Sequence, residues 1–342
     1  MPKKLLVLPG DNEGPSVMDA AESVIRAVSD GIEIVRGEIG ASALKRTGRA
    51  LPADTVSYLA EADAVLSAHC DMSGTGLRNP LEDVRRQMNL FEEVRPFRQL
   101  SRHLGTKKAD VLLITESPDS LPPVREYSTL YGITRESDIS SDASEELFAA
   151  ARATAEGLGR HAACLVAGNG AEPESDRLLA QSFSDAFEGS DMRTEIMSEE
   201  KASCRLALDP SEFDTVISGP GPAGFLRGTL SGIIGGSGLT PVGFIGKEFG
   251  MFMPSRGFGE VSPQRASNPT AALLAAAMAL RHLGESDGAR AVEESVSYMY
   301  ERRRTTADIG GKISPSAFTK GVLKHMETAE TDRAADPNPA VR

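Results

Sequence analysis

The amino-acid sequence predicts an α/β fold with mostly parallel strands. Short apolar segments of strand length alternate along the chain with longer segments of helix length. Several apolar segments end in Gly-rich or polar loops, and in parallel sheets such loops border the ligand site. At 342 residues the chain can bury a large core, so we expect two domains.

The first third of the chain contains three predicted strands. KKLLVL (residues 3–8) is followed by a Gly-rich loop at residues 10–14 and by a helix expected over residues 16–29. The next strands are IEIVRGEIG and ADAVLSAHC, with a helix over residues 52–60 between them. The loops at residues 10–14 and 70–78 follow strands, so both are candidate pocket loops.

The remaining elements continue the same alternation. The strand DVLLITES leads into a third candidate loop at residues 116–120, and DASEELFAAARATAEGLG predicts a helix with Ser144 as its N-cap. ACLVAG and DTVISG are further apolar strands. NPTAALLAAAMALRHLG predicts a buried helix that begins at an Asn-Pro cap and ends at Gly284. Residues 327–342 are polar and contain proline, which predicts a disordered tail.

The composition argues against several classes of protein. The 49 acidic and 37 basic residues give a net charge of −12, which disfavours a general nucleic-acid surface. The three cysteines form no CxxC pair and fit reduced thiols better than a disulfide framework. No segment reaches the roughly 18 apolar residues of a membrane span, and the N-terminal apolar run is too short for a signal peptide. We therefore expect a cytoplasmic protein that binds neither nucleic acid nor a membrane.

Several motifs together resemble the isocitrate/isopropylmalate dehydrogenase family of β-decarboxylating dehydrogenases. The opening VLPGDNEGP is similar to the family's first strand and GDGIGP loop, and VRRQMNLFEEVRPF to its LRxxLxLFxxxRP segment. FDTVISG and SGIIGGSGLTP follow the family's strand, metal-binding helix and GGLGxxP turn. ASNPTAALLAAAMALRHLG and TADIGGKISPSAF resemble its last two motifs. The resemblance covers roughly residues 4–325.

The resemblance implies a two-domain α/β fold with parallel-rich sheets, in which one domain is inserted into the other. Residues 1–97 and 248–342 would form the cofactor-side domain, and residues 98–247 the dimerisation domain. It also implies a dimer, either a homodimer or a heteromer with an intact family member, in which the partner completes each active site. The family oxidises a 2-hydroxy acid with NAD or NADP and then decarboxylates it with Mg²⁺ or Mn²⁺.

Two of the family's substrate-binding arginines are matched here. Arg85 in VRRQM and Arg95 in VRPF lie ten residues apart, on a predicted helix and the strand after it. Arginine suits such a site because its planar guanidinium binds carboxylates through two hydrogen bonds. A solvated basic surface is the alternative reading, since Arg86 and Arg98 lie nearby. The family's third arginine is replaced by Thr115.

The residues for metal binding and proton transfer are not matched. Gly224 and Gly228 stand where the family has two aspartates on its metal helix, and Glu200 is the candidate for the carboxylate lent by the partner subunit. A divalent cation needs two or three converging oxygen ligands, so we expect no metal. Gly168 aligns with the family's catalytic lysine, and Leu121 or Pro122 with its tyrosine.

Arg227 lies between the two glycines and leaves two interpretations open. It could join Arg85 and Arg95 in a cationic cleft that binds a small anionic carboxylate without metal. Alternatively, it could pair with an acidic neighbour such as Glu200 and close the old site.

The family's dinucleotide loop aligns with SRGFGEVSPQRASNPTA. Glu260 matches the acidic ribose ligand and is followed by Val261, while Asn268 matches the residue that contacts adenine. An acid at this position favours NAD, because it accepts hydrogen bonds from the ribose hydroxyl and repels a 2′-phosphate. NAD binding is therefore a prediction for this chain.

The sequence thus supports two functional hypotheses and leaves a third open, a standard dehydrogenase of the family whose catalytic residues align at other positions. The favoured one is a family member that has lost metal-dependent oxidative decarboxylation and acts as a ligand-binding or regulatory paralogue or subunit. The other is an NAD-dependent oxidoreductase that acts on an anionic 2-hydroxy acid by metal-independent chemistry.

Overall fold

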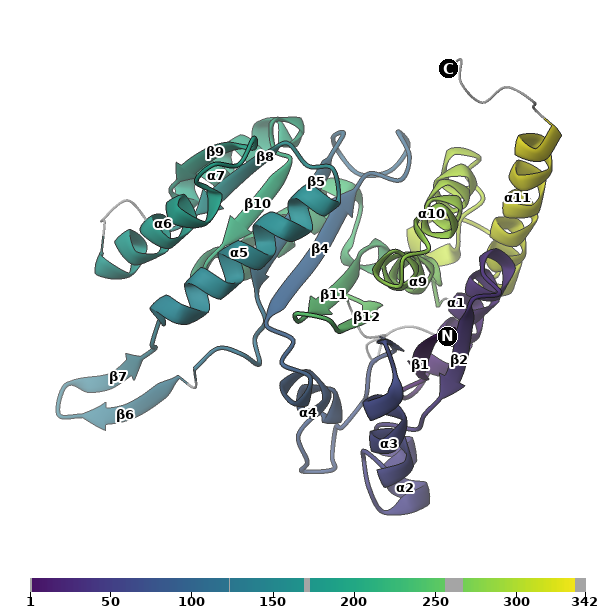
Figure 1. Cartoon of the computed structure of the whole chain (residues 1–342), viewed down its shortest axis with the longest axis horizontal. Helices are drawn as coiled ribbons and strands as arrows, with labels where there is room; N and C mark the ends of the chain where they lie inside the picture. Colours follow the sequence, from purple (N-terminus) through teal and green to yellow (C-terminus); the bar gives the residue numbers. More distant parts are fainter. Residues whose placement is uncertain (1, 123, 169–172, 256–266, 336–342) are drawn as a thin grey trace.

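A ten-stranded sheet lies at the centre of the computed structural model, which describes residues 2–122, 124–168, 173–255 and 267–335 (Figure 1). The strand order is β2-β1-β3-β12-β11-β4-β5-β10-β8-β9, and β6 and β7 form a separate hairpin. The predicted α/β class is confirmed. The strands are β1 (Lys3–Leu8), β2 (Ile32–Arg36), β3 (Ala64–Ser67), β4 (Glu92–Arg98), β5 (Asp110–Glu116), β6 (Arg125–Thr129), β7 (Gly132–Glu136), β8 (Ala162–Val166), β9 (Arg193–Met197), β10 (Thr215–Ser218), β11 (Pro241–Ile245) and β12 (Gly250–Pro254).

The sheet has two parallel outer parts and an antiparallel centre. Strands β2, β1, β3 and β12 pair in parallel at one end, as do β5, β10, β8 and β9 at the other. Between them, β11 and β4 run antiparallel to their neighbours. The inner parallel strands β1, β3, β12, β5, β10 and β8 are largely apolar and buried, as in other sheets covered by helices on both faces, whereas the edge strands β2 and β9 are more exposed.

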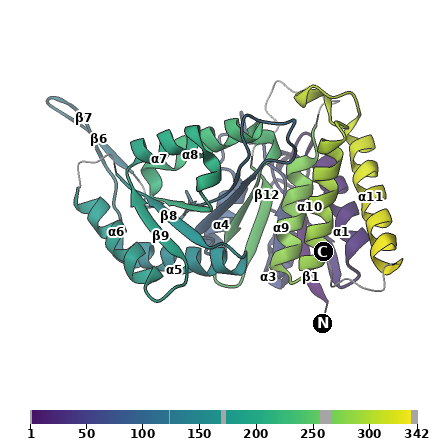
Figure 2. The same cartoon turned by 90° about the horizontal axis from the view of Figure 1, so that it is seen from above.

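Helices cover both faces of this sheet. Figure 2 shows α7 and α8 on one face of the second half and α5 and α6 on the other. Helix α9 packs on β12 and β11 and against α1 and α10. The described α-helices are α1 (Gly14–Val28), α2 (Ala41–Thr47), α3 (Ala53–Glu61), α4 (Pro80–Gln87), α5 (Ser141–Gly157), α6 (Glu174–Phe187), α7 (Glu199–Leu208), α8 (Pro220–Ile234), α9 (Thr270–His282), α10 (Ser286–Glu301) and α11 (Pro315–Ala335).

Local hydrogen bonds explain where two predicted helices begin. Helix α9 starts after the Asn-Pro pair, where the Asn268 side chain accepts a hydrogen bond from the backbone of Thr270 at 3.0 Å. The expected cap of α5 was placed four residues too late. Ser140 is the N-cap and accepts from Ala143, whereas Ser144 lies inside the helix and donates to the Ser140 carbonyl.

The C-terminal segment differs from its prediction as well. Residues 327–335 belong to α11 and so are helical rather than disordered. The apolar side of this helix explains the continuation, because Phe318, Val322 and Met326 are buried in the main core. Residues 336–342 of the predicted tail lie outside the described residues. No described helix is long and apolar enough to cross a membrane.

The chain order fits the predicted insertion of one domain in the other. The first three strands lie in the same half of the sheet as β12, and helices α9 to α11 pack beside them (Figure 1). The intervening chain forms the other half, and β4 and β11 join the two at the centre. The sheet is continuous, so the boundaries at residues 97/98 and 247/248 stay a prediction.

Candidate functional site

Arg227 lies about two turns into α8, on the side of the helix that faces β4. Its Nη1 donates a hydrogen bond to Oε1 of Glu93 at 2.8 Å. The Arg227 side chain is 31% exposed, whereas that of Glu93 is only 1% exposed. The ion pair therefore has a partly open cationic end and a buried anionic end.

Arg95 binds the same carboxylate. Its Nε donates to Oε1 of Glu93 at 2.6 Å, and the two residues share one face of β4 because they are two positions apart. Burial alone would raise the pKa of Glu93, but the adjacent Arg95 and Arg227 guanidiniums hold the pKa below its ordinary value. Glu93 is thus an anion held between two cations.

Arg85 lies close to this pair, above strand β11. Its guanidinium carbon is 4.6 Å from the ring centroid of Phe244, which lies opposite Glu93 in the pairing of β11 with β4. Arg85 also forms an ion pair with Asp119, and both side chains are largely buried. The structure therefore brings together the three arginines that the sequence singled out.

Each of the three arginines is already engaged by a carboxylate of this chain. Glu93 holds Arg95 and Arg227, and Asp119 holds Arg85. Three positive charges face two negative ones, so one positive charge remains in excess. Pairing of Arg227 with an acid is the outcome that the closed-site interpretation predicts, but Glu93 takes the place expected for Glu200. Glu200 is exposed in the first turn of α7 and forms no ion pair within the described residues.

Two buried hydroxyl groups lie on the strand next to this cluster. Thr115 is opposite Glu93 in the pairing of β4 with β5, and Ser117 follows directly after β5. Within the described residues neither hydroxyl oxygen has a hydrogen-bond partner. Unpaired buried hydroxyls are costly, so this end of β5 retains unused hydrogen-bonding capacity beside the arginines.

The positions that align with the family's metal ligands do not fit a metal. Gly224 and Gly228 supply no side-chain oxygen, and a Cβ built at either would meet open space. Among the described residues, no group of three or more His, Cys, Asp or Glu side chains could hold a metal ion. The donor set that a divalent cation requires is therefore not assembled from this chain's described residues.

The backbone at Gly168, which aligns with the lysine position, disfavours a side chain. Gly168 has a φ of +71°, and a Cβ there would approach the Asp176 carboxylate to 1.8 Å. Its carbonyl also accepts a hydrogen bond from the backbone of Glu199 at 2.9 Å. Within that local structure a lysine at residue 168 would require the loop to change shape.

The predicted cofactor residues are only partly described. Glu260 and Val261 lie outside the described residues, so their role stays a prediction. The Asn268 side chain is buried and engaged within the protein: its amide donates to Tyr300 and Asp308, and its oxygen accepts from the backbone of Thr270 at the start of α9. Donation of a hydrogen bond to adenine by this amide would require one of its two present bonds to be replaced.

Sequence reasoning missed the two acids that pair with the arginines. Glu93 lies beside Glu92 in the largely buried strand β4. A carboxylate in a buried strand must either pair with a cation or take up a proton. That signal could have identified Glu93 as a partner of Arg95. No comparable signal marks Asp119, which lies in a loop 34 residues from Arg85.

Residues 4–326 match the sequence family described as isocitrate/isopropylmalate dehydrogenase. The chain belongs to this family. It is 27% identical over 339 residues to an isocitrate/homoisocitrate dehydrogenase of Thermus thermophilus, with 96% of this chain and all of the relative covered. A 3-isopropylmalate dehydrogenase of Methanothermobacter thermautotrophicus is also 27% identical, over 95% of this chain and 98% of the relative.

Solved structures support the same fold. An isocitrate dehydrogenase from Methylococcus capsulatus superposes with a TM-score of 0.84 at 22% identity, covering 95% of this chain and 99% of the other. A β-decarboxylating dehydrogenase from Thermococcus kodakarensis superposes with a TM-score of 0.88 at 18% identity, covering 98% and 99%. At such identities the likeness establishes the isocitrate dehydrogenase-like fold.

Proposed function

We propose that this family member has lost metal-dependent oxidative decarboxylation and acts as a ligand-binding or regulatory subunit that responds to a small anionic carboxylate. The observation that carries the proposal is the ion pair of Arg227 with Glu93. A guanidinium on α8 stands between the two positions that the family uses for metal ligands, and a buried acid of this chain neutralises it.

The missing chemistry supports the same proposal. Without converging oxygen ligands the site offers no Lewis acid to stabilise an enolate. Gly168 itself supplies no proton-transferring side chain at the lysine position, and its φ of +71° is strained for any residue with a Cβ. Loss of one positioned acid or base typically costs 10²–10⁴ in rate, so the family's reaction would be severely slowed on this ground alone.

A carboxylate ligand remains compatible with this geometry. The Arg227 side chain is partly exposed, and the cluster keeps one positive charge more than its own acids neutralise. Glu93 would compete with an incoming carboxylate for Arg95 and Arg227. The affinity of the site for a ligand would therefore depend on the strength of the ion pairs that Glu93 forms with Arg95 and Arg227.

Calorimetric titration with citrate, isocitrate and 3-isopropylmalate tests the proposal, with Mg²⁺ present or with chelator. We expect weak binding that does not depend on Mg²⁺ and no NADH formation when NAD is added. Glu93→Gln removes the competing charge, so it should strengthen binding by about tenfold or more. Arg227→Gln in that background should reverse the gain.

A matched control is Glu195→Gln, because Glu195 also binds two cations, Lys201 and Arg205, but lies on the edge strand β9. It should leave the affinity unchanged. Turnover that depends on Mg²⁺ would contradict the proposed loss of oxidative decarboxylation. Binding that Glu93→Gln leaves unchanged would show that the arginine cluster does not face the ligand.

We also propose that the chain assembles as a dimer, with a second copy or with an intact relative. The hairpin β6–β7 projects away from the body of the molecule (Figure 1) and carries Leu130 and Tyr131, which are 90% and 96% exposed. A two-stranded hairpin is only marginally stable alone, and exposed apolar tips are typical of interfaces. Phe225 on α8 is a further exposed apolar residue, 53% exposed, on a different element.

A further inference from the structure

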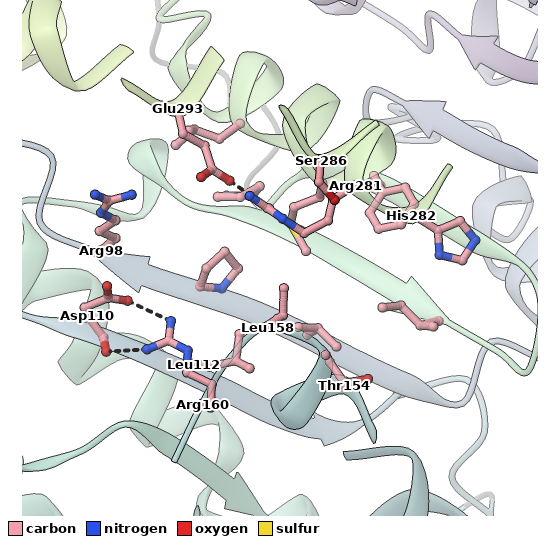
Figure 3. Close-up of a pocket in the computed structure, with 18 of the residues that line it drawn as sticks. Arg98, Asp110, Leu112, Thr154, Leu158, Arg160, Arg281, His282, Ser286 and Glu293 are labelled. Carbon is pink, nitrogen blue, oxygen red and sulfur yellow. Dashed lines mark hydrogen bonds and ion pairs between the residues drawn. The ribbon is translucent and has the colours of Figure 1, made fainter. Parts of the chain in front are cut away.

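A second candidate site lies on the opposite face of the sheet from the arginine cluster. A cavity of about 580 Å³ lies above β4 and β5, between α5 on one side and α9 and α10 on the other (Figure 3). Side chains alternate along a strand, so Val94 and Pro96 face this cavity while Glu93 and Arg95 face α8. Its volume is in the range of sites for small organic ligands.

The floor and one wall of this cavity are apolar. Val94 and Leu112 contribute from the sheet, and Leu274 and Met278 contribute from α9. Leu158, which directly follows α5, lines the opposite side. A ligand that fills this space would bury an aliphatic or aromatic body against these side chains, at roughly 25 cal/mol for each Å² of apolar surface removed from water.

The charged residues at the cavity are mostly neutralised by one another. Arg160 forms ion pairs with Asp110 and Asp214, and Arg281 pairs with Glu293 at 2.8 Å. Figure 3 shows the Arg160–Asp110 and Arg281–Glu293 pairs on different walls of the cavity. Both arginines are therefore compensated, and Arg160 is shared by two acids, of which Asp214 lies outside the described lining.

Arg98 differs from the other cations of the cavity. It lies at the end of β4, is exposed and forms no ion pair within the described residues. His282 adds no charge at neutral pH, because burial lowers its pKa. The described lining thus has three arginines and two acids beside an apolar floor. Arg98, which lies opposite Asp110 in the pairing of β4 with β5, is the lining arginine that forms no ion pair among the described residues, which suits a ligand with one negative charge.

We propose that this cavity binds a small amphipathic monocarboxylate. Its apolar body would lie on Val94, Leu112 and Met278, and its carboxylate would pair with Arg98. Dicarboxylates and tricarboxylates would fit poorly, because the second negative charge would meet apolar side chains or compensated ion pairs. The site is separate from the arginine cluster and would bind its ligand whether or not the proposed function is correct.

Calorimetry with octanoate tests the proposal, with octanamide as an uncharged molecule of the same length. We expect one octanoate per chain and binding of octanamide at least tenfold weaker. Arg98→Gln should remove this preference by weakening octanoate at least tenfold. Arg193→Gln is the matched control, because Arg193 is exposed on the edge strand β9 and removes the same charge from the surface.

A second variant tests the cavity itself. Ala153 is exposed on α5 and lines the cavity, so Ala153→Trp should fill the space with little effect on folding. It should abolish binding of both probes while leaving the melting temperature near that of the wild type. The proposal is overturned if octanoate shows no saturable binding, if octanamide binds equally well, or if Arg98→Gln and Arg193→Gln behave alike.

Discussion

Two neighbouring glutamates on β4 have pKa values shifted in opposite directions, because adjacent residues of a strand face opposite sides of the sheet. Glu93 faces Arg95 and Arg227, and these cations keep its pKa below the ordinary value. Glu92 faces α5, where Thr154 donates to one carboxylate oxygen and the other oxygen has no partner in the described structure. Burial raises the pKa of Glu92 to about 7.

Glu92 should make the stability of the protein depend on pH. Its folded-state pKa lies above the ordinary value of 4.5, so the stabilisation is complete below about pH 4.5 and is lost as the pH rises through 7. The lost stability amounts to about 3 kcal/mol. Glu92→Gln should therefore be more stable than the wild type at pH 8, and the advantage should shrink toward pH 5. Urea unfolding at both pH values measures this difference.

The control for this measurement is Glu188→Gln, since Glu188 is exposed and forms no side-chain ion pair in the described structure. Its effect on stability should be small and the same at both pH values. An advantage of Glu92→Gln that does not change with pH would mean that Glu92 is ionised throughout this range.

The sequence identified the arginines of the candidate site but not the acids that pair with them. Arg85, Arg95 and Arg227 were selected from motifs and do lie together, because the motifs fix the helix and strand that carry them. Their acids were not identified, because pairing depends on the strand register that puts Phe244 opposite Glu93 and on how α8 crosses β4. Local patterns do not encode such contacts between distant segments.

Helix α8 is unusual at the scale of one element because glycines recur on its exposed side. Gly224 and Gly228 are exposed, and a Cβ at either would meet open space within the single chain. Glycine inside a helix costs about 1 kcal/mol relative to alanine. The sequence therefore keeps flexible residues where the fold of one subunit does not require them.

Alanine substitution tests whether α8 is covered in solution. In an isolated chain, Gly224→Ala with Gly228→Ala should raise the free energy of unfolding by about 1–2 kcal/mol in urea unfolding. Gly105→Ala is the opposite control and should destabilise, because Gly105 has a φ of +74° and a Cβ there would meet the Ile233 carbonyl at 2.1 Å. Destabilisation by the α8 variant would show that another helix packs on this face.

Element boundaries were the least predictable part of the fold. The strands and helices of the parallel halves were expected from apolar patterns, and most of them are present. The predicted tail proved partly helical because Phe318, Val322 and Met326 bury one side of α11, and a rule based on polar composition overlooks such spacing. The hairpin β6–β7 was not predicted, since its exposed apolar residues match neither the pattern of a buried strand nor that of a polar loop.

At the scale of the whole molecule, the projecting hairpin predicts association. The wild type should elute with about twice the 36.3 kDa mass of one chain. If it pairs with an intact relative instead, the two chains should elute together after co-expression. Leu130→Ser with Tyr131→Ser removes the exposed apolar tip and should weaken association at least tenfold, as measured by light scattering after size-exclusion chromatography.

The control for association is Tyr58→Ser, because Tyr58 is also an exposed aromatic residue but lies on α3 in the other half of the sheet. It should leave the mass unchanged. A wild type that remains monomeric at high concentration would contradict a homodimer. The experiment with the relative would then decide whether the hairpin recognises a different chain.

Strand β4 belongs to both sites, with Glu93 and Arg95 on one face and Val94 on the other. If a ligand on one face displaces β4, the other face moves with it, and the occupants of the two faces then share a coupling free energy. Thermodynamic linkage makes that coupling reciprocal. If a fatty acid in the cavity beside Val94 changes the affinity for citrate at the arginine cluster by some factor, citrate must change the affinity for the fatty acid by the same factor. A single strand would then allow one metabolite to report on another without any catalysed reaction.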